Sequence, residues 1–224
     1  MTGPGKRGPA AGPDAGVLRE FLREAGIATP DEAIEGLAVH AGEMLRWNRS
    51  IRLTAIVDPV EVAVKHVVDS LELLRFAPFP GRLLDFGSGA GYPGIPLALY
   101  LPGTRIVLLE ASAKKCAFLS RVRSILRLNN VKVVQGRISE REKLPIGRFD
   151  DIVTRATAPP GEIVPLLAPY LAEGGRMLFM MGPGGETGRG GSGEVPAKVT
   201  RIERFRLPGG MGDREIVEMV PLDA

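Results

Sequence analysis

Short apolar runs recur along the second half of the chain, separated by glycine-containing turns and by longer amphipathic stretches. The runs rich in leucine, valine and isoleucine predict buried strands, and they lie at 82–85, 104–109, 131–135, 149–154 and 176–181. The stretches between them predict helices at 95–101, 113–128 and 161–171. Such alternation is typical of a doubly wound, mostly parallel α/β sheet. Two further strand-like runs, separated by LPGGMGD, predict an antiparallel hairpin at the sheet edge, and they lie at 199–207 and 215–220.

The first third of the chain has helical periodicity. Apolar residues from Val17 to Leu22 form one stripe, and the Thr29-Pro30 pair marks a new start, so two helices are expected between 14 and 47. A third helix begins at Asp58, a residue that can cap its first turn. Its apolar positions have helical spacing, and we expect the opposite flank to be exposed; that flank carries Lys65, His66 and Asp69.

These patterns divide the chain into three parts. Residues 1–13 are rich in Gly, Pro and Ala and predict a disordered tail. Residues 14–78 form an expected N-terminal helical extension, and 79–224 the main domain. Within that domain the segment 182–193, GPGGETGRGGSG, predicts a flexible loop.

The segment 82–94, RLLDFGSGAGYPG, predicts a strand that opens through a glycine-rich turn into a helix. Such a turn lets bare backbone approach a ligand. A dinucleotide-binding fingerprint would place a third glycine where Tyr92 stands. Asp85 adds a carboxylate that would repel a pyrophosphate but suits an ammonium group and a sulfonium. The segment therefore favours S-adenosylmethionine over NAD.

Glu110 follows the next predicted strand, where an acidic side chain can accept hydrogen bonds from both hydroxyls of a ribose. NAD would use the same carboxylate. Glu110 therefore supports an adenosine ligand without choosing between the two cofactors.

Composition narrows the class of protein. The 224 residues are 44% hydrophobic, enough for one domain with a buried core, and no apolar stretch near the loop is long enough to span a bilayer. A single cysteine, Cys116, excludes an internal disulfide, and two histidines make a metal site unexpected. We therefore expect a soluble, cytoplasmic protein without metal. A net charge of +3 allows a polyanionic partner without requiring one.

The segment DFGSGAGYPGIPLAL, preceded by VKHVVDSLELL and LTAIVDP, resembles the RsmG (GidB) family, which methylates a guanine at N7 in small-subunit ribosomal RNA. The resemblance extends from about 47 to about 182. It implies a class I, Rossmann-like methyltransferase fold that uses S-adenosylmethionine. It also implies small-subunit (16S) ribosomal RNA, free or within the small ribosomal subunit, as the partner of what we expect to be a monomer.

The turn, the strand-end acid and the resemblance together define the expected cofactor site. Ile138 and Ser139 match family positions that hold the adenine, and Arg155 matches one that touches the cofactor or the guanine, which makes it the expected catalytic residue. The full set is Asp85, Gly87, Ser88, Gly89, Gly91, Tyr92, Glu110, Ile138, Ser139 and Arg155.

Contacts to RNA are expected from basic clusters. Lys114 and Lys115 begin a predicted helix that has no acidic residue, and Arg52 belongs to a group of arginines around Trp47. Such clusters attract phosphates, although a solvated helix face has the same composition. Lys65 and His66 match a family block and could touch RNA or orient the cofactor loop.

Two departures from the family pattern affect the RNA side. Met181 stands where the family usually has lysine, and Arg52 where it usually has asparagine.

Two alternative functions also stay open: a methyltransferase of the same fold with a small-molecule or protein substrate, and an NAD(P)-binding protein. Guanine N7 has an available lone pair, so the lack of a recognisable general base is compatible with methyl transfer to that atom.

Overall fold

The computed structural model describes residues 12–139, 143–155, 158–183 and 195–222. In these residues seven strands form one sheet with the order β3-β2-β1-β4-β5-β7-β6. The first five strands are parallel, and β7 runs antiparallel to both β5 and β6. The strands are β1 (Arg82–Phe86), β2 (Arg105–Glu110), β3 (Val131–Gln135), β4 (Phe149–Arg155), β5 (Leu171–Met181), β6 (Ala197–Arg206) and β7 (Asp213–Pro221). The predicted parallel sheet and its terminal hairpin are confirmed.

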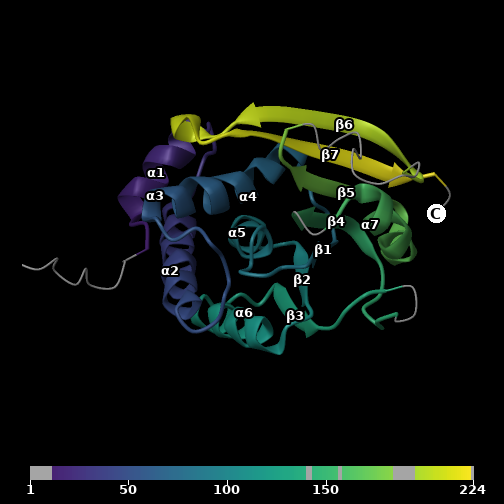
Figure 1. Ribbon diagram of the computed structural model, residues 1–224, viewed down its shortest axis with the longest axis horizontal. Helices are drawn as coiled ribbons and strands as arrows, with labels where there is room; N and C mark the ends of the chain where they lie inside the picture. Colours follow the sequence, from purple (N-terminus) through teal and green to yellow (C-terminus); the bar gives the residue numbers. More distant parts are fainter. Residues whose placement is uncertain (1–11, 140–142, 156–157, 184–194, 223–224) are drawn as a thin grey trace, which may run out of the picture.

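The helices cover both faces of this sheet (Figure 1). They are α1 (Ala15–Glu24), α2 (Asp31–Asn48), α5 (Gly94–Tyr100), α6 (Ala113–Ile125) and α7 (Pro160–Leu167). A continuous helical stretch before β1 consists of α3 (Pro59–Val62), a π-helix (Ala63–Val68), α4 (Asp69–Leu71) and a 3-10 helix (Glu72–Phe76). Short 3-10 turns follow α7 at Ala168–Tyr170 and precede β7 at Pro208–Gly210.

Side chains that alternate along the strands pack into two hydrophobic cores, one on each face of the sheet. Leu83 packs in the cluster that includes Leu18 of α1 and Leu37 of α2, whereas its neighbour Leu84 packs with Ile163 of α7 on the other face. This follows from the two-residue period of a strand. The N-terminal helices thus share a core with the sheet. The division of the chain at residue 78 stays a prediction.

One expectation about the helix before β1 is wrong. His66 and Asp69 are only 6% and 5% exposed, and the Lys65 side chain is 26% exposed, although this flank was expected to face solvent. The reason is tertiary: Tyr92 stacks on His66, and Arg155 and Arg214 approach Asp69 from β4 and β7. A polar helix face can be buried when partners for it arrive from distant parts of the chain.

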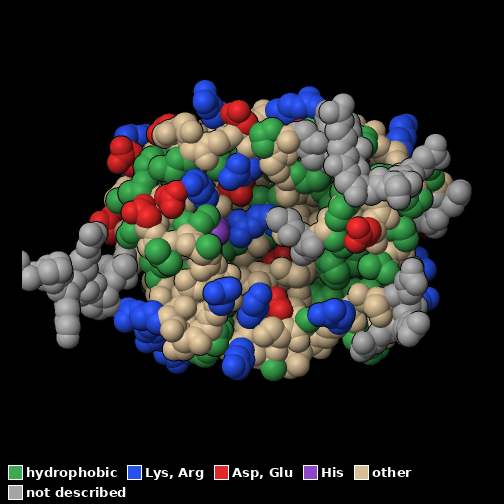
Figure 2. Space-filling view, in the orientation of Figure 1, with side chains coloured by type: hydrophobic (Ala, Val, Ile, Leu, Met, Phe, Trp, Pro, Cys, Tyr) green, Lys and Arg blue, Asp and Glu red, His purple; other side chains and the backbone are tan. Residues whose placement is uncertain are grey.

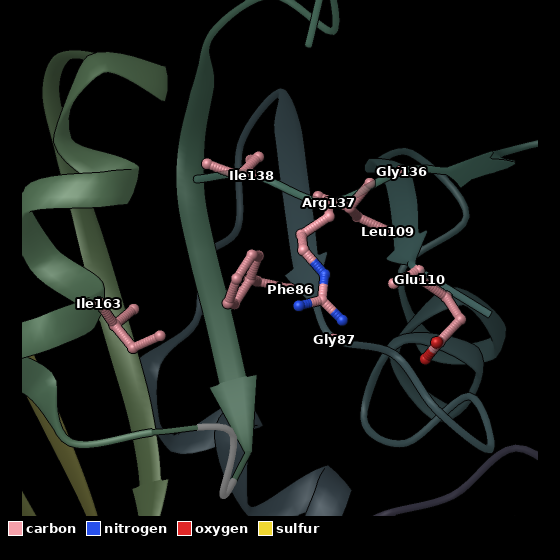
Figure 3. Close-up of a pocket in the computed structure, with 9 residues that line it drawn as sticks. Phe86, Gly87, Leu109, Glu110, Gly136, Arg137, Ile138 and Ile163 are labelled. Atoms are coloured by element: carbon pink, nitrogen blue, oxygen red, sulfur yellow. The ribbon is translucent and has the colours of Figure 1, made fainter. Parts of the chain in front are cut away.

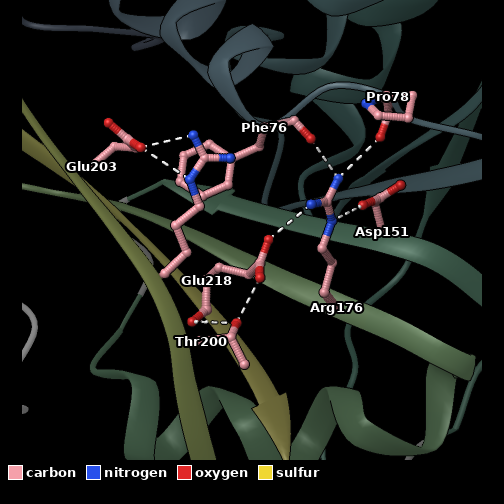
Figure 4. A network of polar contacts seen from close by, with 8 residues as sticks. Phe76, Pro78, Asp151, Arg176, Thr200, Glu203 and Glu218 are labelled. Atoms are coloured by element: carbon pink, nitrogen blue, oxygen red, sulfur yellow. Dashed lines mark hydrogen bonds and ion pairs between the residues drawn. The ribbon is translucent and has the colours of Figure 1, made fainter.

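Arg176 of β5 joins the hairpin to this helical stretch (Figure 4). Its guanidinium donates to Asp151 Oδ1 at 2.7 Å, to Glu218 Oε2 at 2.8 Å and to the Phe76 carbonyl at 2.7 Å. Because a guanidinium has five N–H donors in a rigid plane, one side chain can fix three elements at once. β7 is thereby held beside the end of the 3-10 helix.

No helix in the described parts of the chain is both long and apolar enough to cross a membrane. The same residues contain no group of His, Cys, Asp and Glu side chains that could hold a metal ion. The predicted tail lies outside the described residues up to residue 11, and so does the predicted flexible loop from residue 184 onward.

Candidate functional site

A pocket of about 340 Å³ opens at the carboxyl ends of β1, β2 and β3 (Figure 3). Ligands of open α/β sheets bind at this edge, and the volume lies within the range of small-molecule sites, roughly 300–1,000 Å³. The lining residues include Phe86, Gly87, Leu109, Glu110, Arg137, Ile138 and Ile163. Three of the predicted cofactor residues, Gly87, Glu110 and Ile138, are therefore brought together in one pocket. Ser139 lines an adjoining pocket that shares Ile138.

Glu110 is held in place by backbone donors. Its Oε2 accepts a hydrogen bond from Gly89 N at 3.0 Å, and its Oε1 accepts one from Ser112 N at 2.8 Å. Each carboxylate oxygen can accept two hydrogen bonds. Both oxygens therefore retain capacity for ribose hydroxyls, while the backbone bonds fix their direction.

The turn itself needs glycine at two points. Gly91 has a φ of +85°, and a Cβ there would lie 2.8 Å from Ile95 and 3.1 Å from the His40 ring. A Cβ on Gly94 would lie 2.2 Å from Leu108 and 2.6 Å from Asp85 Oδ2. Close packing of the turn against α2 and β2 thus excludes side chains at these positions.

Asp85 and Ser88 support the turn from behind and do not line the pocket. Asp85 is 1% exposed and accepts a hydrogen bond from Gly94 N at 3.1 Å, and Ser88 Oγ donates to the Asp85 carbonyl at 3.0 Å. Burial raises the pKa of the Asp85 carboxyl to about 7. A direct contact of Asp85 with the ammonium group of a cofactor stays a prediction.

Tyr92 lies in a buried stack of rings. Its ring centroid is 4.4 Å from that of His40 and 4.8 Å from that of His66, and the Arg155 guanidinium lies 5.6 Å from it. Burial lowers the pKa of His40 to about 4, and burial together with the charge of Arg155 lowers that of His66 to about 3. Both imidazoles are neutral at pH 7. His40 was not expected at the site, because it comes from a helix far earlier in the chain.

A second pocket of about 280 Å³ lies beside the first, at the ends of β4 and β5. The two are neighbours because Phe86, in the wall of the first, pairs with Thr154, which precedes Arg155 in the wall of the second. The lining residues are Ile56, Lys65, His66, Asp69, Arg155, Met180, Met181, Gly182 and Arg214. Figure 2 shows Lys and Arg side chains gathered around the hollow in this face.

Arg155 is held at the mouth of β4 by the helical stretch before β1. Its Nη1 lies 3.3 Å from the Lys65 carbonyl, to which it donates, and 3.7 Å from Asp69 Oδ2. Lys65 forms an ion pair with Glu61. Arg214, which no local pattern marked, lies 3.7 Å from the other oxygen of Asp69.

The other predicted RNA contacts lie elsewhere on the surface. Lys114 at the start of α6 and Arg52 before α3 are exposed, and Lys115 is partly exposed. Within the described residues, no ion pair neutralises either lysine. These side chains are available to a polyanion but do not line either pocket.

Comparisons with known proteins find relatives over most of the chain. The family model GidB, described as rRNA small subunit methyltransferase G, matches residues 33–187. The ribosomal RNA small subunit methyltransferase G of Geotalea uraniireducens is 34% identical over 200 residues, which cover 88% of this chain and 91% of the relative. The protein of that name from Anaeromyxobacter dehalogenans is 48% identical over 167 residues, which cover 74% of this chain and 77% of the relative.

Solved structures show the same fold at low identity. A precorrin-6y C5,15-methyltransferase from Geobacter metallireducens has a TM-score of 0.51 at 16% identity, with 77% of this chain and 92% of that chain covered. The tRNA (uracil-54, C5)-methyltransferase of Pyrococcus abyssi, solved with S-adenosyl-L-homocysteine, has a TM-score of 0.51 at 16% identity, with 69% and 38% covered. The predicted class I methyltransferase fold is confirmed.

Proposed function

This chain belongs to the GidB family of small-subunit rRNA methyltransferases, and from that premise we propose that it transfers a methyl group from S-adenosylmethionine to N7 of a guanine in 16S ribosomal RNA. The observation that carries the proposal is the pair of adjoining pockets at one edge of the sheet. The first pocket offers Glu110, Arg137 and apolar walls. The second offers Arg155 and Arg214 beside Asp69. We further propose that it acts in the cytoplasm, as a monomer, on the RNA or on the small ribosomal subunit.

The first pocket fits the adenosine part of the cofactor. Glu110 presents acceptors for the ribose hydroxyls, and Phe86, Leu109 and Ile138 supply apolar surface for the base. Gly87 and Gly89 bring bare backbone to the pocket mouth, where the rest of the ligand would pass. We assign Gly91, Tyr92, Asp85 and Ser88 to the support of this turn, since all four lie behind it or within its bend.

The second pocket receives the guanine. When bound, S-adenosylmethionine supplies a methyl group on a positively charged sulfur. Guanine N7 has a free lone pair, so a methyl group transferred to it would require no residue of the protein to remove a proton. The protein then has to orient the base, and well-oriented reactants can gain several kcal/mol, up to roughly 7–11, from proximity alone. Arg155 is placed for this role because it lines the second pocket and directly follows Thr154, which pairs with Phe86 in the wall of the first.

The basic side chains outside the pockets would hold the RNA by its phosphates. Lys114, Lys115 and Arg52 are candidates, since phosphate contacts position a nucleic acid without reading its sequence. Lys65 is bound to Glu61, so an RNA phosphate would have to compete for it. His66 is buried under Tyr92, which favours a role in supporting the pocket over direct RNA contact.

The test is methylation of 16S RNA and of isolated small subunits with labelled S-adenosylmethionine, followed by mass spectrometry of nuclease digests. We expect 7-methylguanosine at one position. Arg155→Ala should melt within a few degrees of the wild type yet lower the single-turnover rate at saturating cofactor and RNA by at least about tenfold. Transfer only to a small molecule or a protein would overturn the proposal, and a normal rate for Arg155→Ala would remove Arg155 from the reaction.

A further inference from the structure

We propose that Asp69 is a positioning residue that holds Arg155 and Arg214 at the second pocket, an inference that rests on the proposed function of that pocket. Asp69 lies in α4, Arg155 at the end of β4 and Arg214 near the start of β7. Each oxygen of the carboxylate faces one guanidinium, with Oδ2 3.7 Å from Arg155 Nη1 and Oδ1 3.7 Å from Arg214 Nε. A single side chain thus joins arginines from two strands that β5 separates in the sheet.

The distances show that Asp69 attracts the arginines without using up their donors. Hydrogen bonds between nitrogen and oxygen are roughly 2.7–3.2 Å long, and both contacts are longer. A guanidinium has five N–H groups. Arg155 otherwise donates from Nη1 to the Lys65 carbonyl, and its Nη2 lies 3.5 Å from His66 Nδ1. Arg214 donates to the Asp213 carbonyl at 2.9 Å. Both side chains therefore keep N–H groups for a ligand in the pocket they line.

The position of Asp69 is unfavourable for stability alone. The side chain is 7% exposed, and burial raises the pKa of its carboxyl to about 6. The charges of Arg155 and Arg214 act in the opposite direction, and the charge of Glu72 raises this pKa further, so Glu72→Gln would favour the ionised form of Asp69. A buried ion pair often gains little over apolar packing because desolvation offsets the attraction. A carboxylate beside a pocket for RNA also repels phosphate. The desolvation cost and the repulsion of phosphate both disfavour an acid at this position. Its presence is explained if the reaction depends on how the two arginines are oriented.

The chain supplies a matched control. Glu72 lies three positions after Asp69 in the same helical stretch, is 2% exposed, and pairs with Arg75, which does not line the pocket. Asp69→Asn and Glu72→Gln each remove one buried carboxylate from the same segment with little change in shape. A purely structural role predicts similar effects of both changes on melting and on activity.

The experiment compares the two variants with the full-length wild type. We expect both to lose stability, but only Asp69→Asn to lower the single-turnover methylation rate at saturating RNA, by at least about tenfold. Affinity for S-adenosylhomocysteine, measured by calorimetry, should stay within about twofold for both. If Asp69→Asn does not fold, Asp69→Glu gives the same comparison, because it keeps the charge but displaces it by one methylene.

A second measurement does not depend on activity. The Nη–H signals of Arg155 and the Nε–H signal of Arg214, assigned by NMR, should exchange faster with water in Asp69→Asn and stay unchanged in Glu72→Gln. Equal rate losses in the two variants, or loosened arginines with a normal rate, would overturn the inference. Failure of the wild type to methylate RNA would instead overturn the proposed function, and the exchange comparison would still show whether Asp69 holds the arginines.

Discussion

At the level of single residues, Glu110 connects the glycine turn with α6, because its carboxylate accepts hydrogen bonds from Gly89 N and Ser112 N. Cys116 adds to the same point, since its thiol lies 3.3 Å from the Glu110 carbonyl, to which it donates. The thiol is thus a packed structural group. These contacts leave the carboxylate directed at the pocket with little freedom, which lowers the entropy lost on binding a ligand.

Replacing Glu110 by alanine should weaken S-adenosylhomocysteine binding by about 1.5–3 kcal/mol, the range for hydrogen bonds to a charged group. Isothermal titration calorimetry measures this directly. Glu173→Ala, at an exposed acid of β5, is the control and should bind normally. Equal affinities for the wild type and Glu110→Ala would refute the assignment of Glu110 to the ribose.

At the level of elements, α2 and the π-helix pack against the turn between β1 and α5. His40 of α2 stacks on one side of Tyr92 and His66 of the π-helix on the other. His40 Nε2 also lies 2.8 Å from the Ala90 carbonyl, to which it donates. This stacking requires neutral imidazoles, because the rings of His40 and His66 are buried and a charged ring would have to be desolvated.

His40 should therefore make the protein sensitive to acid. The unfolded chain protonates this imidazole below about pH 6.5, whereas the folded protein resists until about pH 4. The resulting stability is fully present above the first value and is lost as the pH falls towards the second, by roughly 3 kcal/mol. Urea unfolding across this range should show a smaller loss in His40→Gln than in the wild type. Part of the loss persists in the variant, because the pKa of His66 is also lowered, to about 3, and His66 is present in both proteins.

The comparison between the two proteins isolates His40. The pKa values of Asp69 and Asp85 are raised by burial, so these carboxyls add stability as the pH falls, but they do so in both proteins. Parallel curves of unfolding free energy against pH for the wild type and His40→Gln would mean that His40 is not a buried neutral group.

At the level of the whole molecule, β6 and α6 differ in how many of their basic side chains form ion pairs within the described residues. Arg201, Arg204 and Arg206 of the edge strand β6 each face an acidic partner. Lys114 and Lys115 of α6 have no such partner among the described residues. Unpaired cations release more counterions on binding a polyanion, so α6 rather than the hairpin is expected to face the RNA.

Lys115→Ala should lower the slope of log affinity for 16S RNA against log salt by about one unit, with little change in rate at saturating RNA. Arg206→Ala removes a cation that is 73% exposed but lies 3.6 Å from Asp213, and should leave the slope nearly unchanged. Filter binding at several salt concentrations distinguishes the two variants. A larger slope change for Arg206→Ala would place the RNA on the hairpin.

The sequence by itself determined the sheet, the glycine turn and the strand-end acid. Alternating apolar runs mark strands because side chains alternate between faces. The turn and Glu110 lie within one βα unit and the strand that follows, so local spacing was enough to bring Gly87 and Glu110 to one edge, whereas Ile138, which follows β3, was expected there from the family resemblance. The boundary of β5 was missed, since it begins at Leu171 instead of residue 176; two glycines at 174 and 175 obscured the strand pattern.

Only the tertiary structure decided what surrounds this unit. Asp69, Arg155 and Arg214 are far apart in the chain, and His40 precedes Tyr92 by a similarly long stretch. Periodicity showed which face of a helix is polar, but it could not show that a tyrosine and two arginines would bury His66 and Asp69. Contacts of this kind depend on long-range packing of many weakly specified surfaces, whereas the turn depends on local backbone geometry.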